Sequence, residues 1–191
     1  MQSLKKYLDQ LAPVSPKAWK KVQSLFTERT LGKSAFFIQH NQKAREIGFL
    51  TEGLLRAYYT SPGGVEYNKH FFVGPCFVGG YASLITGLPN QINQQALTPC
   101  RILVASYAAF QELYAQHHEL ERAARMLAER FFAQKEQREI ELVLLDAEQR
   151  YSIFKRDFSK LEQVIPQYHI ASYLGVSATQ LSRIRRKLAG R

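Results

Sequence analysis

The 191-residue sequence predicts an α+β fold: a β unit, then one long helix, then a short helical segment that ends in a pair of helices. Short segments rich in β-branched and aromatic residues, parted by Gly and Pro turns, fill residues 30–107. Residues 117–146 contain neither Gly nor Pro and are rich in good helix formers. Helical patterning returns in 147–191, where Pro166 and Gly175 interrupt it. We therefore divide the chain into 1–116, 117–146 and 147–191.

The N-terminal stretch is expected to be helical. Leu4, Leu8 and Leu11 recur at helical spacing, and a second apolar set follows up to about residue 28. Pro13 and Pro16 should divide this stretch into two short helices, because proline removes a backbone donor and clashes with the preceding turn.

Residues 30–107 predict a sandwich-like or barrel-like β unit, because several short strands are joined by tight turns. A small helix is expected near residues 81–84. The expected strands are 35–38, 47–50, 54–59, 70–73 and 102–104.

The stretch 117–146 predicts a helix roughly 45 Å long at about 1.5 Å per residue. An apolar stripe along it has the spacing of a coiled-coil seam. The stripe consists of Leu120, Ala124, Leu127, Phe131, Leu142 and Leu145, with Gln134 and Arg138 interrupting it. We expect one face of the helix to pack on its own β unit and another on a second copy. The alternative is a helix that packs only within its own chain.

Positive charge is concentrated near the C-terminus. Of the net charge of +10, residues 147–191 hold +6, from nine Lys/Arg and three Asp/Glu. Such a concentrated field favours a polyanionic partner such as nucleic acid. A merely solvated basic tail is the alternative.

Other protein classes find little support. There is no apolar run of membrane-spanning length and no secretory signal pattern, so we expect a cytoplasmic protein. Cys76 and Cys100 do not form a metal-binding motif and are expected to be buried free thiols. The adjacent His117 and His118 point in different directions on a helix and do not predict a metal site. We identify no catalytic residues, no metal ligands and no cofactor site, so the protein is not expected to be an enzyme.

Residues 167–186 fit a helix-turn-helix unit. Pro166 suits the start of the first helix, and Gly175 suits a left-handed turn between the helices. Ser177 and Gln180 form a capping box for the second helix. Ile170, Leu174, Val176, Leu181, Ile184 and Leu188 are expected to face the core.

The remaining face of the second helix is small, polar and basic, as a helix that enters the major groove requires. Arg183 can donate two hydrogen bonds to a guanine edge, and the following basic side chains can meet phosphates. His169, in the first helix, either reaches a phosphate or faces solvent. The candidate contacts to double-stranded DNA are Ser177, Ala178, Thr179, Ser182, Arg183, Arg185, Arg186 and Lys187.

The sequence resembles the Crp/Fnr family of bacterial transcription regulators over nearly its whole length. The resemblance lies in residues 53–59 (GLLRAYY), 63–66 (GGVE), 74–79 (GPCFVG), 170–177 (IASYLGVS) and 181–184 (LSRI). It implies a jelly-roll β-roll of the cyclic-nucleotide-binding type, a long dimerisation helix and a C-terminal helix-turn-helix domain. It also implies a homodimer, formed through 117–146, that binds a near-palindromic DNA site, with RNA polymerase as a further candidate partner.

Two departures from the family pattern matter. Members that bind cyclic AMP use a Gly-Glu pair and then an Arg-Ser or Arg-Thr pair, but here these positions hold Gly79-Gly80 and Asn90-Gln91. Without a guanidinium, the pocket lacks a charge-assisted contact to the phosphate, so we expect no tight cyclic-nucleotide binding in the usual mode. The second departure is that the recognition helix is followed by little or no wing.

The degenerate pocket is assigned to Gly79, Gly80, Tyr81, Asn90 and Gln91. It could be empty, filled by a side chain such as Tyr81, or remodelled for an unknown small-molecule effector. The leading interpretation is a sequence-specific transcription regulator. The alternative is an effector-sensing β-roll module whose C-terminal helices contact protein instead of DNA.

Overall fold

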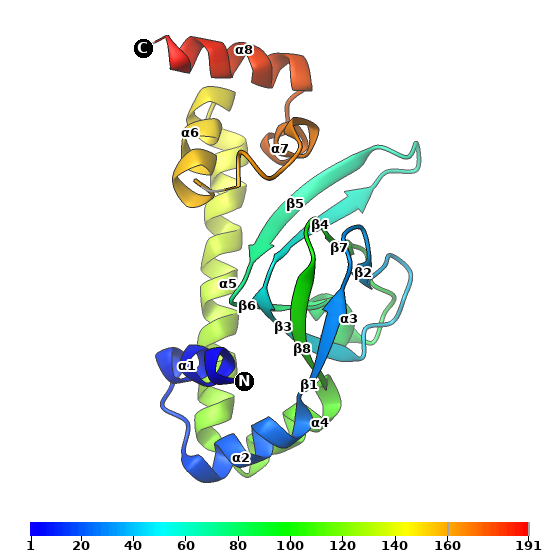
Figure 1. The fold of residues 1–191 in the computed structure, drawn as a ribbon, viewed down its shortest axis with the longest axis vertical. Helices are drawn as coiled ribbons and strands as arrows, with labels where there is room; N and C mark the ends of the chain where they lie inside the picture. The colour runs from blue at the N-terminus through cyan, green and yellow to red at the C-terminus, as the bar shows by residue number, and fades with distance from the viewer. Residues whose placement is uncertain (160, 191) are drawn as a thin grey trace. The chain divides into compact units, whose positions relative to one another are not determined.

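The expected succession of a helical lead, a β unit, a long helix and further helices is present in the computed structural model, which describes residues 1–159 and 161–190. The chain forms two compact units (Figure 1). The roll unit comprises Met1–Tyr58 and Phe71–Arg130, and the helical unit comprises Tyr59–His70 and Phe131–Arg191.

Two short helices open the roll unit, as Pro13 and Pro16 predict. The first, α1, spans Gln2–Leu11, and the second, α2, spans Pro16–Leu25. The Ser15 side chain accepts a hydrogen bond from the Ala18 N–H and so caps the start of α2.

Within residues 1–159 and 161–190, eight strands form two four-stranded sheets, with the orders β1-β8-β3-β6 and β2-β7-β4-β5. Their bounds are β1 Thr27–Leu31, β2 Phe36–Ile38, β3 Glu46–Glu52, β4 Leu54–Thr60, β5 Glu66–Val73, β6 Cys76–Val78, β7 Asn93–Ala96 and β8 Cys100–Ser106. Strands β1, β6 and β7 were not expected. β1 and β7 are rich in polar residues and carry little strand signal, so their antiparallel pairing with β8 and β4 is what defines them as strands.

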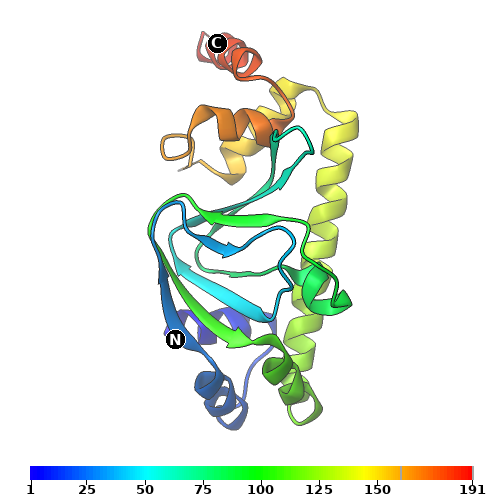
Figure 2. The same ribbon diagram turned by 90° about the vertical axis from the view of Figure 1, so that its right-hand side faces the viewer.

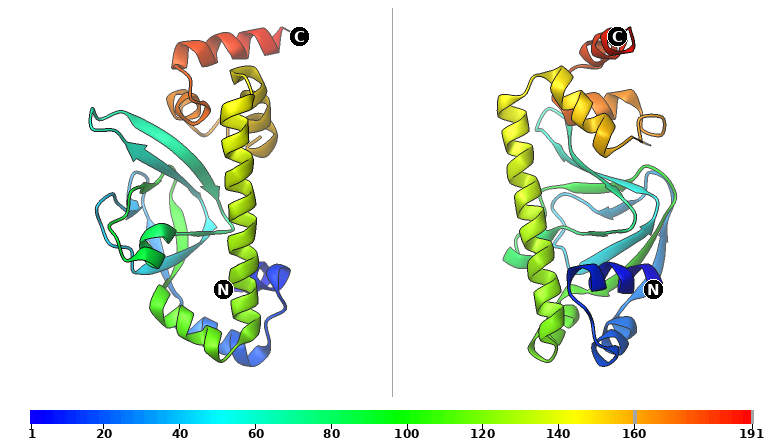
Figure 3. Two further views of the ribbon diagram at one scale, coloured as in Figure 1. Left: turned by 180° about the vertical axis from the view of Figure 1, so that it is seen from behind. Right: turned by 90° about the vertical axis from the view of Figure 1, so that its left-hand side faces the viewer.

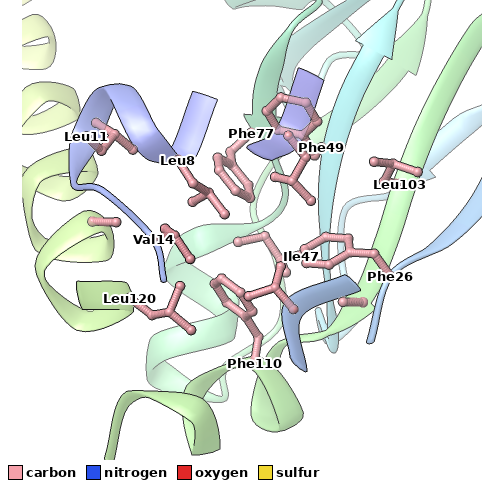
Figure 4. Close-up of a cluster of buried hydrophobic side chains, with 14 of the residues drawn as sticks. Leu8, Leu11, Val14, Phe26, Ile47, Phe49, Phe77, Leu103, Phe110 and Leu120 are labelled. Atoms are coloured by element: carbon pink, nitrogen blue, oxygen red, sulfur yellow. The ribbon is translucent and has the colours of Figure 1, made fainter. Parts of the chain in front are cut away.

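The core of the roll unit joins the N-terminal helices to one sheet (Figure 4). Phe49 and Phe77 lie edge to face at 5.1 Å between ring centroids, and Tyr7 packs edge-on against both. Leu4 and Leu8 of α1 are buried in the same cluster, which explains the helical spacing of leucines at the start of the chain.

The remaining helices lie between and after the strands. Their bounds are α3 Tyr81–Thr86, α4 Tyr107–Glu112, the 3-10 helix η1 Leu113–Ala115, α5 His118–Leu144, α6 Ala147–Asp157, α7 Gln167–Leu174 and α8 Ala178–Ala189. The long helix α5 is continuous over 27 residues (Figure 3) and confirms the expectation from 117–146. No helix in residues 1–159 and 161–190 is both long and apolar enough to cross a membrane.

The faces of α5 differ in what they contact. Leu120 is fully buried in the roll-unit core and Leu127 packs partly against it, so this part of the apolar stripe faces its own chain. A different face carries large apolar side chains in solvent: Phe132 is 71% exposed, Ile140 45% and Val143 81%.

Candidate DNA-binding site

The turn between α7 and α8 has the geometry that its sequence predicts. Gly175 ends α7 with φ of 71°, a left-handed conformation that favours glycine. The Val176 N–H donates to the Ala171 carbonyl at 3.0 Å. The Ser177 Oγ accepts from the Gln180 N–H at 3.1 Å, and the Gln180 side chain accepts from the Ser177 N–H at 2.9 Å. The predicted capping box is therefore confirmed.

The buried side of the helix pair also agrees with the sequence pattern. Ile170, Leu174 and Leu181 are almost completely buried, and Ile184 is buried as well. Val176 and Leu188, expected in the core, are only half-buried because they lie at its margin. These contacts fix α8 to α7, so the orientation of one helix determines that of the other.

The opposite side of the pair is open to solvent. All eight candidate DNA contacts are exposed: Ser177, Ala178, Thr179, Ser182, Arg183, Arg185, Arg186 and Lys187. Small side chains occupy the first turn of α8, as a helix that enters the major groove would require for a close approach to base edges. The side chain of Arg183 follows one turn later on the same side of the helix.

The basic side chains of α8 fall into two groups. Arg185 lies 3.1 Å from Glu162, and the Lys187 Nζ lies 2.5 Å from a carboxylate oxygen of Glu148 in α6. Within residues 1–159 and 161–190, Arg183 and Arg186 form no ion pair. Their charges are therefore available to a polyanion without breaking an internal contact.

Glu162 is shared between two partners. The Tyr151 hydroxyl donates a hydrogen bond to it, while Arg185 approaches the same carboxylate oxygen. Burial, together with this hydrogen bond, raises the pKa of Tyr151 to about 12. The cluster joins α6, α8 and the segment before α7.

The expectation for His169 was wrong. This side chain neither faces solvent nor stands ready for a phosphate, because only 5% of its surface is exposed. It packs against Asn68, which no sequence pattern had singled out. The two residues are 101 positions apart in the chain, so local patterning could not reveal the contact.

The residues assigned to the degenerate effector pocket differ in their surroundings. Gly80 and Asn90 are brought together: a methyl group at Gly80 would lie 2.8 Å from the Asn90 Oδ1. Asn90 is buried and donates hydrogen bonds to the carbonyls of Gln39 and Ile92. Gln91 is exposed, and Tyr81 is 53% exposed with its ring edge against Tyr107, so the Tyr81 ring does not fill the roll interior.

Gln94, which no sequence pattern had singled out, lies beside Gly79. Gln94 is fully buried and its Nε2 donates to the Gly79 carbonyl at 2.8 Å. Among the described residues, its Oε1 has no hydrogen-bond partner. Gln94 belongs to β7, and the strand was not recognised because its sequence, NQQA, is polar.

Fold and site together define a cyclic-nucleotide-binding-type β-roll followed by a long helix and a helix-turn-helix pair. Residues 28–117 match the family model of the cyclic nucleotide-binding domain. No curated protein sequence matches the chain significantly.

Solved structures of transcription regulators share the fold at low sequence identity. The c-di-GMP-responsive global regulator CLP of Xanthomonas campestris has a TM-score of 0.71 and 16% identity, over 92% of each chain. FixK2 of Bradyrhizobium japonicum has a TM-score of 0.74 and 15% identity, over 87% of this chain and 85% of its own. A transcriptional regulator assigned to the Crp/Fnr family from Eubacterium rectale has a TM-score of 0.75 and 14% identity, over 96% of this chain and 88% of its own. The fold expected from the Crp/Fnr resemblance is therefore confirmed.

Proposed function

We propose that this protein is a sequence-specific DNA-binding transcription regulator of the bacterial cytoplasm that acts as a homodimer. The observation that carries the proposal is the exposed face of α8, where Ser182, Arg183 and Arg186 lie open beside a capped first turn. The N–H groups of that turn and the arginines together suit contact with phosphates and base edges.

The same face argues against the alternative function. A helix that docks on protein usually presents apolar anchors at its centre. The large apolar residues Leu181 and Ile184 of α8 are instead buried within the helix pair, and Leu188 is half-buried. Apart from alanines, the exposed positions of α8 are polar or basic, which favours DNA over a protein partner.

We infer that the protein dimerises through α5, which would allow it to recognise a two-fold symmetric site. Phe132, Ile140 and Val143 follow one another at helical spacing on one exposed face. Three large apolar side chains in one exposed row on a helix are costly to leave in water, and a second copy of the same helix would cover them. Two recognition helices about one DNA turn apart would then read a near-palindrome.

We also propose that cyclic nucleotides are not tight ligands in the usual mode. Asn90 stands where a guanidinium would hold the phosphate, and its amide is engaged by the carbonyls of Gln39 and Ile92. Cyclic AMP at millimolar concentration should leave the melting temperature and the DNA affinity unchanged. A saturable rise in melting temperature would contradict this part of the proposal.

The test of DNA binding compares two variants of equal charge. Arg183→Glu/Arg186→Glu and Lys20→Glu/Lys21→Glu each replace two cations by two anions, but the second pair lies on exposed positions of α2. Affinity for a mixed-sequence DNA duplex is measured by fluorescence anisotropy at several salt concentrations. The α8 variant should lose binding while the α2 variant retains most of it. Equal losses would mean that only net charge matters, and would contradict the assignment of α8.

A further inference from the structure

The hairpin between β4 and β5 contacts the first helix of the DNA-binding pair. Residues 59–70 are continuous with β4 and β5, yet they form one compact unit with α6, α7 and α8. Figure 2 shows the hairpin beside α7 within this unit. The strands of the hairpin therefore belong to the sheet, while residues 59–70 pack with the helices.

The turn of the hairpin is tightly built. The Gly64 N–H donates to the Ser61 carbonyl at 2.9 Å, and the Ser61 N–H donates to the Val65 carbonyl at the same distance. The Ser61 Oγ also accepts from the Val65 N–H at 3.1 Å. Gly64 has φ of 82°, which the turn requires and glycine permits. These bonds hold the two arms of the hairpin together.

One serine of α7 satisfies the free edge of β5. In the part of the chain that the structure describes, strand β5 lies at the edge of its sheet, with β4 as its neighbour. The Ser172 Oγ accepts from the Asn68 N–H at 2.9 Å and donates to the Glu66 carbonyl at 2.8 Å. A single hydroxyl thus makes both bonds that an added strand would make at this point.

Asn68 adds a second contact one helical turn away. Its Nδ2 donates to the His169 carbonyl at 3.1 Å and lies 3.3 Å from the His169 Nδ1. Both side chains are buried, at 7% and 5% exposed. Buried polar groups are costly unless paired, so this contact favours one position of the hairpin along α7.

The aromatic neighbours extend the contact into the rest of the helical unit. His70 of β5 packs edge-on against Phe158, and Phe158 packs against Tyr173 of α7. The Arg138 guanidinium of α5 lies over the Tyr173 ring and donates to the Tyr173 carbonyl. The hairpin, α5 and α7 are therefore held in one packed cluster.

We propose that the 59–70 hairpin is a strap that positions the recognition helix. Because α8 is fixed to α7 by their shared core, bonds from the hairpin to α7 also restrain α8. The strap does not cover the exposed face of α8, so it holds that face in place without blocking it. A change in β4 or β5 would then be passed to the DNA-binding helices through Ser172 and Asn68. The inference rests on the proposed DNA binding only for its functional consequence.

The experiment uses the full chain with Ser172→Ala, which removes both hydroxyl bonds. Ser172→Thr keeps the hydroxyl and serves as the rescue variant. Tyr67→Ala changes an exposed neighbour on β5 and serves as the matched control. Two quantities are measured: hydrogen exchange of the Asn68 amide, which does not involve DNA, and affinity for a selected DNA site.

For Ser172→Ala, exchange at Asn68 should rise about tenfold or more, and DNA affinity should fall about three- to tenfold, as expected for loss of one or two hydrogen bonds. Base preference and salt dependence should stay unchanged, because the strap touches no DNA. Unchanged exchange would overturn the strap itself. Faster exchange with equal or higher affinity would overturn its coupling to DNA binding. Should wild-type protein bind no DNA, the proposed function fails while the exchange result still tests the strap.

If Ser172→Ala melts well below wild type, Asn68→Ala provides the second test. It removes the side-chain bonds to α7 but leaves the Ser172 hydroxyl in place. The amides of α7 near His169 should exchange faster, and DNA affinity should fall by a similar factor. If these α7 amides exchange no faster in Asn68→Ala than in Tyr67→Ala, the proposal is overturned.

Discussion

Lys187 in α8 is paired with Glu148 in α6, with 2.5 Å between its Nζ and a carboxylate oxygen. Its neighbour Arg186 has no such carboxylate partner within residues 1–159 and 161–190. The two adjacent cations therefore differ in how much of their positive charge is available to interact with a DNA phosphate. This difference can be measured through the salt dependence of binding.

Arg186→Ala should lower the slope of log affinity against log salt by about one, because one phosphate contact and its released counterions are lost. Lys187→Ala should lower it by clearly less than one, since Glu148 already neutralises much of the charge. Salt titrations on one DNA duplex measure both slopes. Equal decreases would show that the pair with Glu148 opens fully on DNA.

Arg183→Ala should relax base preference at one position of each half-site. A bidentate contact from arginine to guanine contributes roughly 1–3 kcal/mol of discrimination, and alanine cannot replace it. Affinities for the selected site and its single-base variants measure this change. Arg186→Ala is the control and should weaken all sequences evenly. An even loss for Arg183→Ala too would exclude base readout by this side chain.

Val143→Glu should shift the protein from dimer to monomer. Val143 is 81% exposed on the face of α5 that also carries Phe132 and Ile140, and a charge there would have to be buried in the dimer. We expect the dimer dissociation constant to rise by a factor of about thirty or more, measured by sedimentation. Gln134→Glu is the matched control, because Gln134 is exposed nine residues earlier, about two and a half turns away and on the opposite side. A dimer that tolerates Val143→Glu as well as Gln134→Glu would contradict this interface.

Gly80→Ala should destabilise the roll unit by about 1–3 kcal/mol, because its methyl group would crowd the Asn90 Oδ1 and the Ile38 side chain. Asn90→Ala removes the crowded Asn90 side chain, but it also removes the hydrogen bonds of Asn90 to the carbonyls of Gln39 and Ile92. The double variant should be more stable than the sum of the single losses predicts. Urea denaturation of the four proteins gives the coupling energy. Strict additivity would show that Asn90 does not occupy the space beside Gly80.

His70 should make the fold sensitive to mild acid. Burial lowers the pKa of His70 to about 4 from its usual value of 6.5, with Lys69 and Arg138 acting in the same direction. Between these values the unfolded chain binds the proton and the folded chain does not. The free energy of unfolding should therefore fall as the pH drops from 6.5 to 4, by at most about 2–3 kcal/mol. His70→Gln should lose this part of the pH dependence. A parallel curve for wild type and variant would contradict the assignment.

Local sequence signals were sufficient to predict the two helices α7 and α8 and the turn between them. Gly175, Ser177 and Gln180 lie within six residues of one another, and each acts on the backbone next to it. The leucines of α1 and the Gly- and Pro-free stretch of α5 are likewise local patterns. These features could be predicted because turn and cap geometry depends on few neighbours.

Contacts between distant residues could not be predicted in the same way. Asn68 and Ser172 are 104 positions apart, and Asn68 belongs to no motif, although Ser172 lies within the helix-turn-helix segment. Gln94 is polar and fully buried, a placement that hydropathy opposes and that its bond to Gly79 makes tolerable. The apolar stripe of α5 was visible in the sequence, but only packing shows that Leu120 of this stripe faces its own chain. The exposed row of Phe132, Ile140 and Val143 lies on another face and was not predicted.

We propose that α8 reads DNA sequence in a two-fold symmetric arrangement. The most direct test is recovery of bound sequences from a random DNA pool with purified full-length protein and no added ligand. We predict an enriched near-palindrome whose half-sites lie about one helical turn apart, and the base preference at one position of each half-site should relax when Arg183→Ala is used. Salt-sensitive binding with no enriched sequence would contradict specific readout by this helix.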